Sequence, residues 1–187
     1  PLEGYLFPDT YAFLNKDVDV KTIVETMLDE TGEKLEEYKE SIEKSKYSVH
    51  KTLTLASIVE LEGASANDRA GVAGVFHNRL KDGWTLGSDV TTYYAAKIDM
   101  GDRDLYKSEL NDCNNYNTRC SSFKSLPISP ICNPSMESII AVLEPTNEDY
   151  LYFVADKNGK TYFTYTYPEH LAKRDELIEA GLWYTYN

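Results

Sequence analysis

Two glutamates near the end of one apolar segment are the residues of this chain best placed for acid–base chemistry. The segment Leu55-Ala-Ser-Ile-Val-Glu-Leu-Glu62 lies within Thr52 to Gly63, where six of twelve residues are apolar and glycine stands last. Apolar content with a terminal glycine predicts a short buried helix that ends near Gly63. The first glutamate, Glu60, points with Ser57 toward the polar side of this helix.

The second glutamate, Glu62, falls on the apolar face of the predicted helix. At about 100° per residue it continues the i, i+3, i+4, i+7 row formed by Leu55, Ile58 and Val59. A carboxyl group held against apolar surface favours its neutral form, which raises its pKa and suits a general acid near neutral pH. The alternative is a frayed helix end at which the carboxylate reaches water or a lysine, since perturbed carboxylates also occur in structural roles.

The composition describes an acidic, tyrosine-rich globular chain. Its 187 residues are 42% apolar, enough to bury a core as one domain, or as one domain with a small lobe. The net charge of −12 argues against nucleic acid or an anionic membrane surface as a partner, because both need a positive patch. The 15 tyrosines suit a cleft for sugars or peptides, and equally the edges of a core.

Cysteines and histidines give no sign of a metal site or a cofactor. Cys113, Cys120 and Cys132 lack paired spacing and a neighbouring histidine. In an exported protein, one disulfide among them with one free thiol is expected; in the cytosol all three would be reduced. The three histidines are widely separated, and we interpret them as structural: His50, His77 and His170.

Neither a membrane span nor a targeting segment can be read from these residues. No stretch approaches the roughly 20 apolar residues of a membrane span, and no signal peptide is present. The chain opens without a methionine, in a segment with a structured pattern, so we expect it to be an excised domain of a longer protein.

Periodicity predicts a helix-rich α+β domain. The helices expected besides that of Glu62 are Val20–Ser45, bent near Gly32; a helix capped by Asn67 or Asp68 and ended near Gly83; one from Ser88 or Asp89 to about Lys97; Ser135–Leu143; and Pro168–Ala180. Two strands, 150–155 and 160–165, flank a turn at 156–159 and form an antiparallel hairpin. The segment 100–134 has no clear periodicity, and such segments are usually functional or disordered.

Six blocks of the sequence, in the same order and over nearly its whole length, match one known family. They are Glu3-Gly-Tyr-Leu-Phe-Pro-Asp-Thr-Tyr11, Leu55-Ala-Ser-Ile-Val-Glu-x-Glu62, Val72-Ala-x-Val-Phe-x-Asn-Arg-Leu80, Ser88-Asp89 with Thr91, Tyr116-Asn-Thr118 and Tyr150-Leu-Tyr-Phe-Val-Ala-Asp156. The chain resembles the catalytic domain of the endolytic murein transglycosylases, the YceG-like (MltG) family. The resemblance implies that residues 1–187 are this domain alone, preceded in the longer protein by a transmembrane helix and a LysM-like lobe.

The resemblance also implies a reaction. It is the non-hydrolytic cleavage of the β-1,4 bond between N-acetylmuramic acid and N-acetylglucosamine, within peptidoglycan strands at the extracytoplasmic face of the cell membrane. Glu62 corresponds to the family's catalytic glutamate, which would protonate the leaving oxygen and then accept the proton of the muramic C6 hydroxyl, closing a 1,6-anhydro ring. Cell-wall synthases (penicillin-binding proteins) are the implied protein partners, and no cofactor is implied.

Further positions acquire roles by the same resemblance. Substrate contacts are expected from Ser88, Asp89, Thr91, Tyr116, Asn117 and Thr118, and support of the catalytic helix from Glu60, Asn78 and Arg79. Each also has a structural interpretation. Ser88 or Asp89 would be a helix N-cap, residues 116–118 a turn, and the supporting residues a solvent-facing surface.

Three departures from the family pattern fall in the expected cleft loops. The usual Leu-Gln-Ser-Asp-Pro-Thr is Leu86-Gly-Ser-Asp-Val-Thr91 here, Gly-Leu-Pro-Pro-Gly-Pro-Ile becomes Ser125-Leu-Pro-Ile-Ser-Pro-Ile131, and a histidine common after the hairpin turn is Thr161. These changes predict a divergent member with altered specificity.

Two other functions stay open. A catalytically weak module that binds glycan strands as a scaffold would be indifferent to Glu62→Gln. A hydrolytic muramidase that uses Glu62 and Asp89 with a water would release reducing ends and depend strongly on Asp89.

Overall fold

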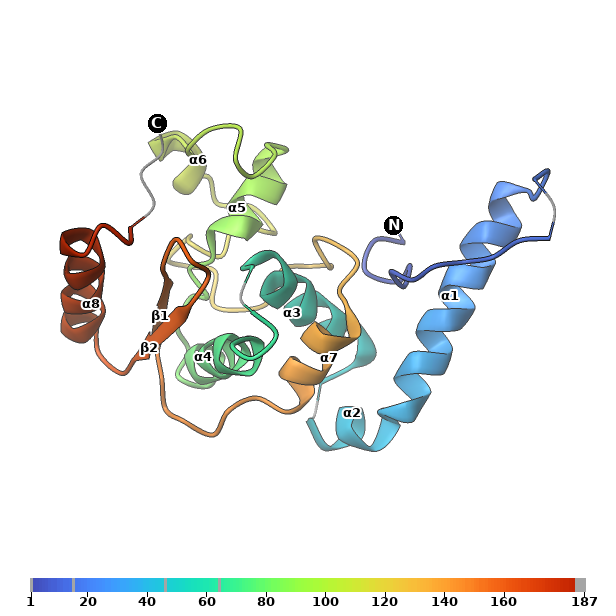
Figure 1. Ribbon diagram of the computed structural model, residues 1–187, viewed down its shortest axis with the longest axis horizontal. Coiled ribbons are helices and arrows are strands. Elements are labelled where there is room, and N and C mark those ends of the chain that lie inside the picture. The colour runs from blue at the N-terminus through green and yellow to red at the C-terminus, as the bar shows by residue number, and fades with distance from the viewer. Residues whose placement is uncertain (1, 15, 46, 64, 184–187) are drawn as a thin grey trace.

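Three helices pack together at the centre of the molecule: α3 (Val49–Leu61), α4 (Arg69–Lys81) and α7 (Met136–Leu143). The other elements lie around them (Figure 1). The computed structural model describes residues 2–14, 16–45, 47–63 and 65–183. The elements in chain order are α1 (Val20–Glu37), α2 (Lys39–Ser45), α3 (Val49–Leu61), α4 (Arg69–Lys81), α5 (Asp89–Ala96), α6 (Lys107–Leu110), α7 (Met136–Leu143), β1 (Tyr152–Ala155), β2 (Thr161–Thr164) and α8 (Tyr167–Glu179). This helix-rich α+β fold with one small antiparallel sheet confirms the predicted class.

Helix α3 lies in the core because it is apolar or small on every side. Its residues from Thr52 to Val59 are all buried, and it packs against α4 and α7. Even Ser57 faces protein, since its hydroxyl donates to the Thr54 carbonyl and accepts from the backbone N–H of Ile131. The prediction that Ser57 marks a polar outer side of this helix is therefore wrong.

The β-hairpin and α8 form one flank of the core, opposite α1 (Figure 1). The strands pair with Val154 opposite Tyr162, and Asp156 closes their turn by accepting hydrogen bonds from two backbone N–H groups. Thr166 and Glu169 form a capping box that starts α8. The predicted hairpin and C-terminal helix are confirmed, with somewhat shorter strands.

The long helix predicted over residues 20–45 is two helices. The chain leaves α1 at Tyr38 and enters α2 at once, whereas Gly32 lies inside α1 with open space around it. The change of direction brings Ile42 into a buried position as α2 packs against α7. Within the described ranges, none of the helices combines the length and the apolar content needed to cross a membrane.

The segment 100–134 contains one short helix and one disulfide that links residues close in sequence. It contains the single turn of helix α6 and a disulfide between Cys113 and Cys120, and Cys132 is a free thiol. One disulfide with one free cysteine was one of the two arrangements left open by the sequence.

Candidate active site

The carboxyl group of Glu62 lies at the C-terminal end of α3 and faces a pocket of about 350 Å³. The backbone N–H of Glu62 still bonds to the Ile58 carbonyl at 3.0 Å, so this helix end is not frayed. Residues from α4, the start of α5 with the loop before it, the loop after α6, the hairpin and α8 complete the pocket. They are Phe76, Arg79, Leu86, Gly87, Ser88, Asp89, Arg119, Tyr152, Phe153, Tyr167 and His170.

Burial raises the pKa of Glu62 to about 7. The hydrogen bond from Ser88 and the charges of Arg79 and Arg119 act to lower this pKa, while the charge of Asp89 acts to raise it. Burial outweighs them because the apolar side chains of the pocket (Phe76, Leu86 and Phe153) cannot replace the water that an ionised carboxylate would hold. Near neutral pH the group is therefore present in both forms, as a residue that acts first as acid and then as base requires.

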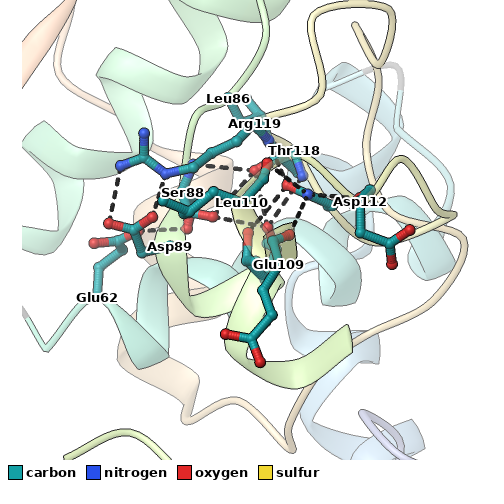
Figure 2. Close-up of polar contacts among 12 residues, drawn as sticks. Glu62, Leu86, Ser88, Asp89, Glu109, Leu110, Asp112, Thr118 and Arg119 are labelled. Atoms are coloured by element: carbon teal, nitrogen blue, oxygen red, sulfur yellow. Dashed lines mark hydrogen bonds and ion pairs between the residues drawn. The ribbon is translucent and has the colours of Figure 1, made fainter. Parts of the chain in front are cut away.

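One hydrogen bond fixes the orientation of the Glu62 carboxyl group. The Ser88 hydroxyl donates to Oε1 of Glu62 at 2.5 Å, and Figure 2 shows the two side chains together. Ser88 occupies the N-cap position of α5, but its side chain makes no capping hydrogen bond. The N-cap interpretation thus describes the place of Ser88 in the fold, whereas its hydroxyl serves the glutamate.

Two buried polar side chains, Thr118 and Thr91, hold the backbone of Ser88 in place, and a third, Asn117, anchors the loop that carries Thr118. The N–H of Ser88 donates to Thr118 Oγ1 at 3.0 Å, and its carbonyl accepts from Thr91 Oγ1 at 2.8 Å. Asn117 donates to three carbonyl groups at and after the end of α6 and accepts from the Thr92 hydroxyl at 3.0 Å. Because Thr91, Asn117 and Thr118 are all buried, they lie beneath Ser88 and do not line the pocket.

Tyr116, another predicted contact, lies outside the pocket. Its ring packs on Tyr94 with centroids 4.9 Å apart, and its hydroxyl lies 2.8 Å from Ser129 Oγ. Of the six predicted substrate contacts, the structure therefore brings only Ser88 and Asp89 to the surface that Glu62 faces.

Asp89 and Arg119 form an ion pair at the mouth of the pocket. Their side chains are 49% and 42% exposed, and two nitrogens of Arg119 donate to the two carboxylate oxygens of Asp89 (Figure 2). Both oxygens of the second carboxylate in this pocket are thus already engaged by a cation.

Arg79 and Asn78 tie α4 to the hairpin. Arg79 donates to the carbonyl of Leu151 (2.7 Å), just before β1, and to that of Leu86 (2.5 Å), in the loop before α5. Asn78 donates to the carbonyl of Tyr150 (2.9 Å). The interpretation of these two residues as solvent-facing is therefore wrong.

The glycine that departs from the family pattern also has a reason here. At Gly87 the backbone φ is +65°, and an added Cβ would lie 3.1 Å from Nη1 of Arg79. Glycine thus lets the loop before Ser88 approach Arg79 closely.

Glu60 anchors α7 to α3 and is not part of the pocket. It accepts from the backbone N–H (3.0 Å) and hydroxyl (2.5 Å) of Ser135, from the Ser138 hydroxyl (2.7 Å) and from Arg69 (3.2 Å). Burial raises the pKa of Glu60, but these hydrogen bonds and the Arg69 charge outweigh it and leave the pKa lowered. Glu60 is therefore ionised at neutral pH and is neither an acid catalyst nor a plain surface residue.

His170 lines the pocket, a position that its interpretation as a structural histidine did not predict. Its ring stacks beside Tyr152 and Tyr167, with centroids 5.6 and 6.2 Å away, and its buried Nδ1 has no hydrogen-bond partner among the described residues. Burial, with the charges of Arg79 and Arg174, lowers the pKa of His170 and favours the neutral ring. His50 and His77, by contrast, hold partners at both ring nitrogens.

A larger hollow elsewhere is a weaker candidate for a catalytic site. A groove of about 850 Å³ runs between α3, α4 and residues 125–128, but no aspartate or glutamate lines it. Nowhere in the described ranges do three or more potential ligands of the His, Cys, Asp and Glu types gather so that they could hold a metal ion.

Comparisons with known proteins agree on one family. The model of the YceG-like family matches residues 1–176. A Bacillus subtilis protein named endolytic murein transglycosylase is 43% identical over 180 residues, 96% of this chain and 49% of that protein. A Streptococcus pneumoniae (strain D39) protein of the same name is 33% identical over 184 residues, 97% of this chain and 33% of that protein.

A solved structure is also similar. The crystal structure of a YceG-like protein from Listeria monocytogenes has a TM-score of 0.83 at 39% identity, covering 92% of this chain and 55% of that one. The chain spans about half, or less, of the length of the curated relatives it matches.

Proposed function

Because the chain belongs to the YceG-like family, we propose that it is the transglycosylase domain of a peptidoglycan lyase, which cuts within glycan strands without using water. The observation that carries this proposal is the carboxyl group of Glu62. It lies in a pocket, its pKa is raised to about 7, and it accepts a hydroxyl hydrogen bond at 2.5 Å. The names of the two similar bacterial proteins support the same reaction.

Glu62 would supply both proton transfers. In its neutral form it donates a proton to the oxygen that links N-acetylmuramic acid to N-acetylglucosamine, and the bond from that oxygen to the muramic C1 breaks. The resulting carboxylate takes the proton of the muramic C6 hydroxyl as this oxygen bonds to C1. The 1,6-anhydro ring closes, and Glu62 is again protonated for the next cycle.

A hydrolytic mechanism finds less support in the pocket. An inverting or retaining glycosidase needs a second carboxylate free to hold a water or to attack C1. Asp89 is the available candidate, and both of its oxygens accept hydrogen bonds from Arg119. Since the muramic C6 hydroxyl serves as the nucleophile in the proposed reaction, that reaction needs no such group.

Sugar contacts are proposed for the residues at the surface of the pocket. Ser88 and Asp89 would meet hydroxyl and acetamido groups, and the rings of Tyr152, Tyr167 and His170 would pack against sugar faces. Thr91, Asn117 and Thr118 would act indirectly, by positioning Ser88. Action on peptidoglycan also implies an extracytoplasmic location, and we propose the membrane face and cell-wall synthases as setting and partners.

The experiment that tests the proposal is mass spectrometry of purified glycan strands digested with the domain, with Glu62→Gln and with Asp89→Asn. Products ending in 1,6-anhydro-muramic acid are expected from the first, and a rate lower by about 10²–10⁴-fold from Glu62→Gln. Asp89→Asn should keep the anhydro ends. Reducing ends, heavier by one water and lost in Asp89→Asn, would instead identify a muramidase. Equal binding and no cleavage by all three proteins would identify a scaffold module.

A further inference from the structure

A disulfide closes the loop that lies beneath Ser88. Cys113 and Cys120 are joined; they lie seven positions apart in the sequence, and their Cα atoms are 5.4 Å apart. Their loop contains Asn117, Thr118 and Arg119, each of which bonds to α5 or to the loop before it. The family's reaction uses no cysteine, so the proposed function leaves this cross-link without a role.

The closed loop reaches Glu62 through two short steps. Thr118 accepts the backbone N–H of Gly87 at its carbonyl (3.0 Å) and that of Ser88 at its hydroxyl (3.0 Å). Ser88 then donates its own hydroxyl to Glu62 (Figure 2). The next residue of the loop, Arg119, pairs with Asp89, whose charge also acts on Glu62. The loop therefore sets both a hydrogen bond to the acid and the charges at the mouth of its pocket.

The two cysteine residues differ in exposure. Cys120 is buried, as are Asn117 and Thr118, whereas Cys113 is exposed. A thiolate from solution can therefore reach the disulfide at Cys113 while the bonded part of the loop is protected. No helix or strand frames residues 113–120, so the cross-link restrains this loop together with the side-chain bonds of Asn117, Thr118 and Arg119.

We propose that the Cys113–Cys120 disulfide is a positioning device for the catalytic acid, because it holds Thr118 where Thr118 fixes Ser88 against Glu62. The inference rests on the proposed function for its effect on the rate, but its effect on Glu62 itself does not depend on activity. Reduction by a dithiol opens the device: the reductant forms its own disulfide, and Cys113 and Cys120 each become a thiol.

The direction in which opening the loop changes the pKa of Glu62 can be predicted. A donor to the ionised carboxylate favours ionisation, so loss of the Ser88 contact leaves burial less opposed and the pKa of Glu62 rises, by about one unit for a hydrogen bond to a charged group. A neutral Glu62 still protonates the leaving oxygen, but without the Ser88 hydrogen bond its carboxyl group is no longer held in one orientation. We therefore expect the rate at low pH to fall several-fold and the alkaline fall in rate to move to higher pH.

The test is a carbon-13 NMR titration of the glutamate side-chain carboxyls, with Glu62 assigned by comparison with Glu62→Gln. It compares the oxidised protein, the dithiol-reduced protein and Cys113→Ala/Cys120→Ala. Cys132→Ala keeps the disulfide and is the matched control, since Cys132 lies outside the closed loop and donates to the Ser57 carbonyl. Thr118→Val removes the hydroxyl that holds Ser88, and Thr118→Ser keeps it.

The expected result is a higher Glu62 pKa in the reduced protein, in the double alanine variant and in Thr118→Val, with wild-type values in Cys132→Ala and Thr118→Ser. The same variants should show the shifted pH–rate profile on glycan strands. An unchanged Glu62 pKa in reduced protein that is still folded by circular dichroism overturns the inference, whether or not the domain cleaves. Absence of cleavage by the oxidised protein, with the pKa shift present, would count against the proposed function alone.

Discussion

Glu62 keeps a carboxyl group partly protonated near neutral pH by means of its surroundings. Removal from water is the largest influence, and Ser88 limits it through a hydrogen bond that favours the ionised form. The balance leaves the pKa of Glu62 at about 7, so that both the neutral and the ionised forms are populated near neutral pH. A single residue can then give and retake one proton at the pH of its surroundings.

This arrangement costs stability, and Glu62→Gln should recover it. The folded pKa is raised from 4.5 to about 7, so the folded state holds more protons than the unfolded state between these values. The contribution of Glu62 to stability is therefore most favourable below about pH 4.5 and falls as the pH rises toward 7. Since one pKa unit corresponds to about 1.4 kcal/mol, Glu62→Gln should be more stable than wild type by about 1–3 kcal/mol at pH near 8, with the gap closing near pH 4. Urea unfolding at several pH values measures this, and a gap independent of pH would contradict it.

Ser88→Ala should separate orientation from acidity. Without the hydroxyl the pKa of Glu62 is expected to rise, because the donor to the ionised form is gone, and the alkaline fall in the rate should move up by about one pH unit. Ser88→Thr, which keeps a hydroxyl, is the matched control. The pH dependence of kcat/KM reports the effect, and a shift to lower pH in Ser88→Ala would show that Ser88 acts otherwise.

At the level of helices and strands, the sequence predicted those elements whose ends are set by neighbouring residues. The Asp156 turn with apolar strands on both sides and the glycine after α3 gave elements close to those observed. The break at Tyr38 could not be read locally, because it depends on where Ile42 is buried. The burial of the Glu62 carboxyl group could be predicted, because the position of a residue on a helix is a local property.

The partners of Glu62 were harder to predict. Thr91, Asn117 and Thr118 were identified, but whether they face a ligand or the interior depends on how α5 and α6 dock. His170 reaches the pocket from α8, and an isolated histidine on an amphipathic helix gives no signal of this. Arg119 was also missed, since its pairing with Asp89, thirty positions away at the start of α5, has no sequence pattern.

Two glycines inside helices should respond in opposite ways to alanine. At Gly32 in α1 nothing lies within 4 Å of an added Cβ, so Gly32→Ala should stabilise by about 0.5–1 kcal/mol. At Gly71 in α4 an added Cβ would lie 2.4 Å from the ring of Phe163, so Gly71→Ala should destabilise by about 1–3 kcal/mol as the hairpin is displaced. Thermal unfolding of the two variants measures both signs, and a stabilising Gly71→Ala would show that the hairpin is not packed this tightly.

Glu60 should matter for the cohesion of α3 and α7. Glu60→Ala leaves the polar groups of Ser135, Ser138 and Arg69 without their acceptor, at a cost of about 2–3 kcal/mol. Because its folded pKa is lowered, the stability it contributes is present above its unfolded pKa near 4.5 and is lost as the pH falls further. Urea unfolding at neutral and acid pH should show the deficit shrinking toward acid. Glu40→Ala is the control, since its side chain is 87% exposed.

At the scale of the whole molecule, the pocket is assembled from parts that are distant in the sequence. Helix α3 supplies the acid, the loop before α5 its hydrogen-bond donor, α4 the arginine that joins loop to hairpin, and α8 an aromatic wall. The flank formed by the hairpin and α8 therefore has to pack on the three central helices before the pocket around Glu62 is complete. A protein with intact helices but a displaced hairpin should bind and cleave poorly.

The measurement that tests the central claim most directly is the pH dependence of kcat/KM for glycan-strand cleavage by the oxidised domain. If Glu62 acts as a general acid with a pKa of about 7, the rate is flat in mildly acidic solution and falls tenfold per unit above about pH 7. Glu62→Gln should show a low rate without this fall. A wild-type rate that stays constant to about pH 9, or the same fall in Glu62→Gln, would contradict the assignment of Glu62 as the acid.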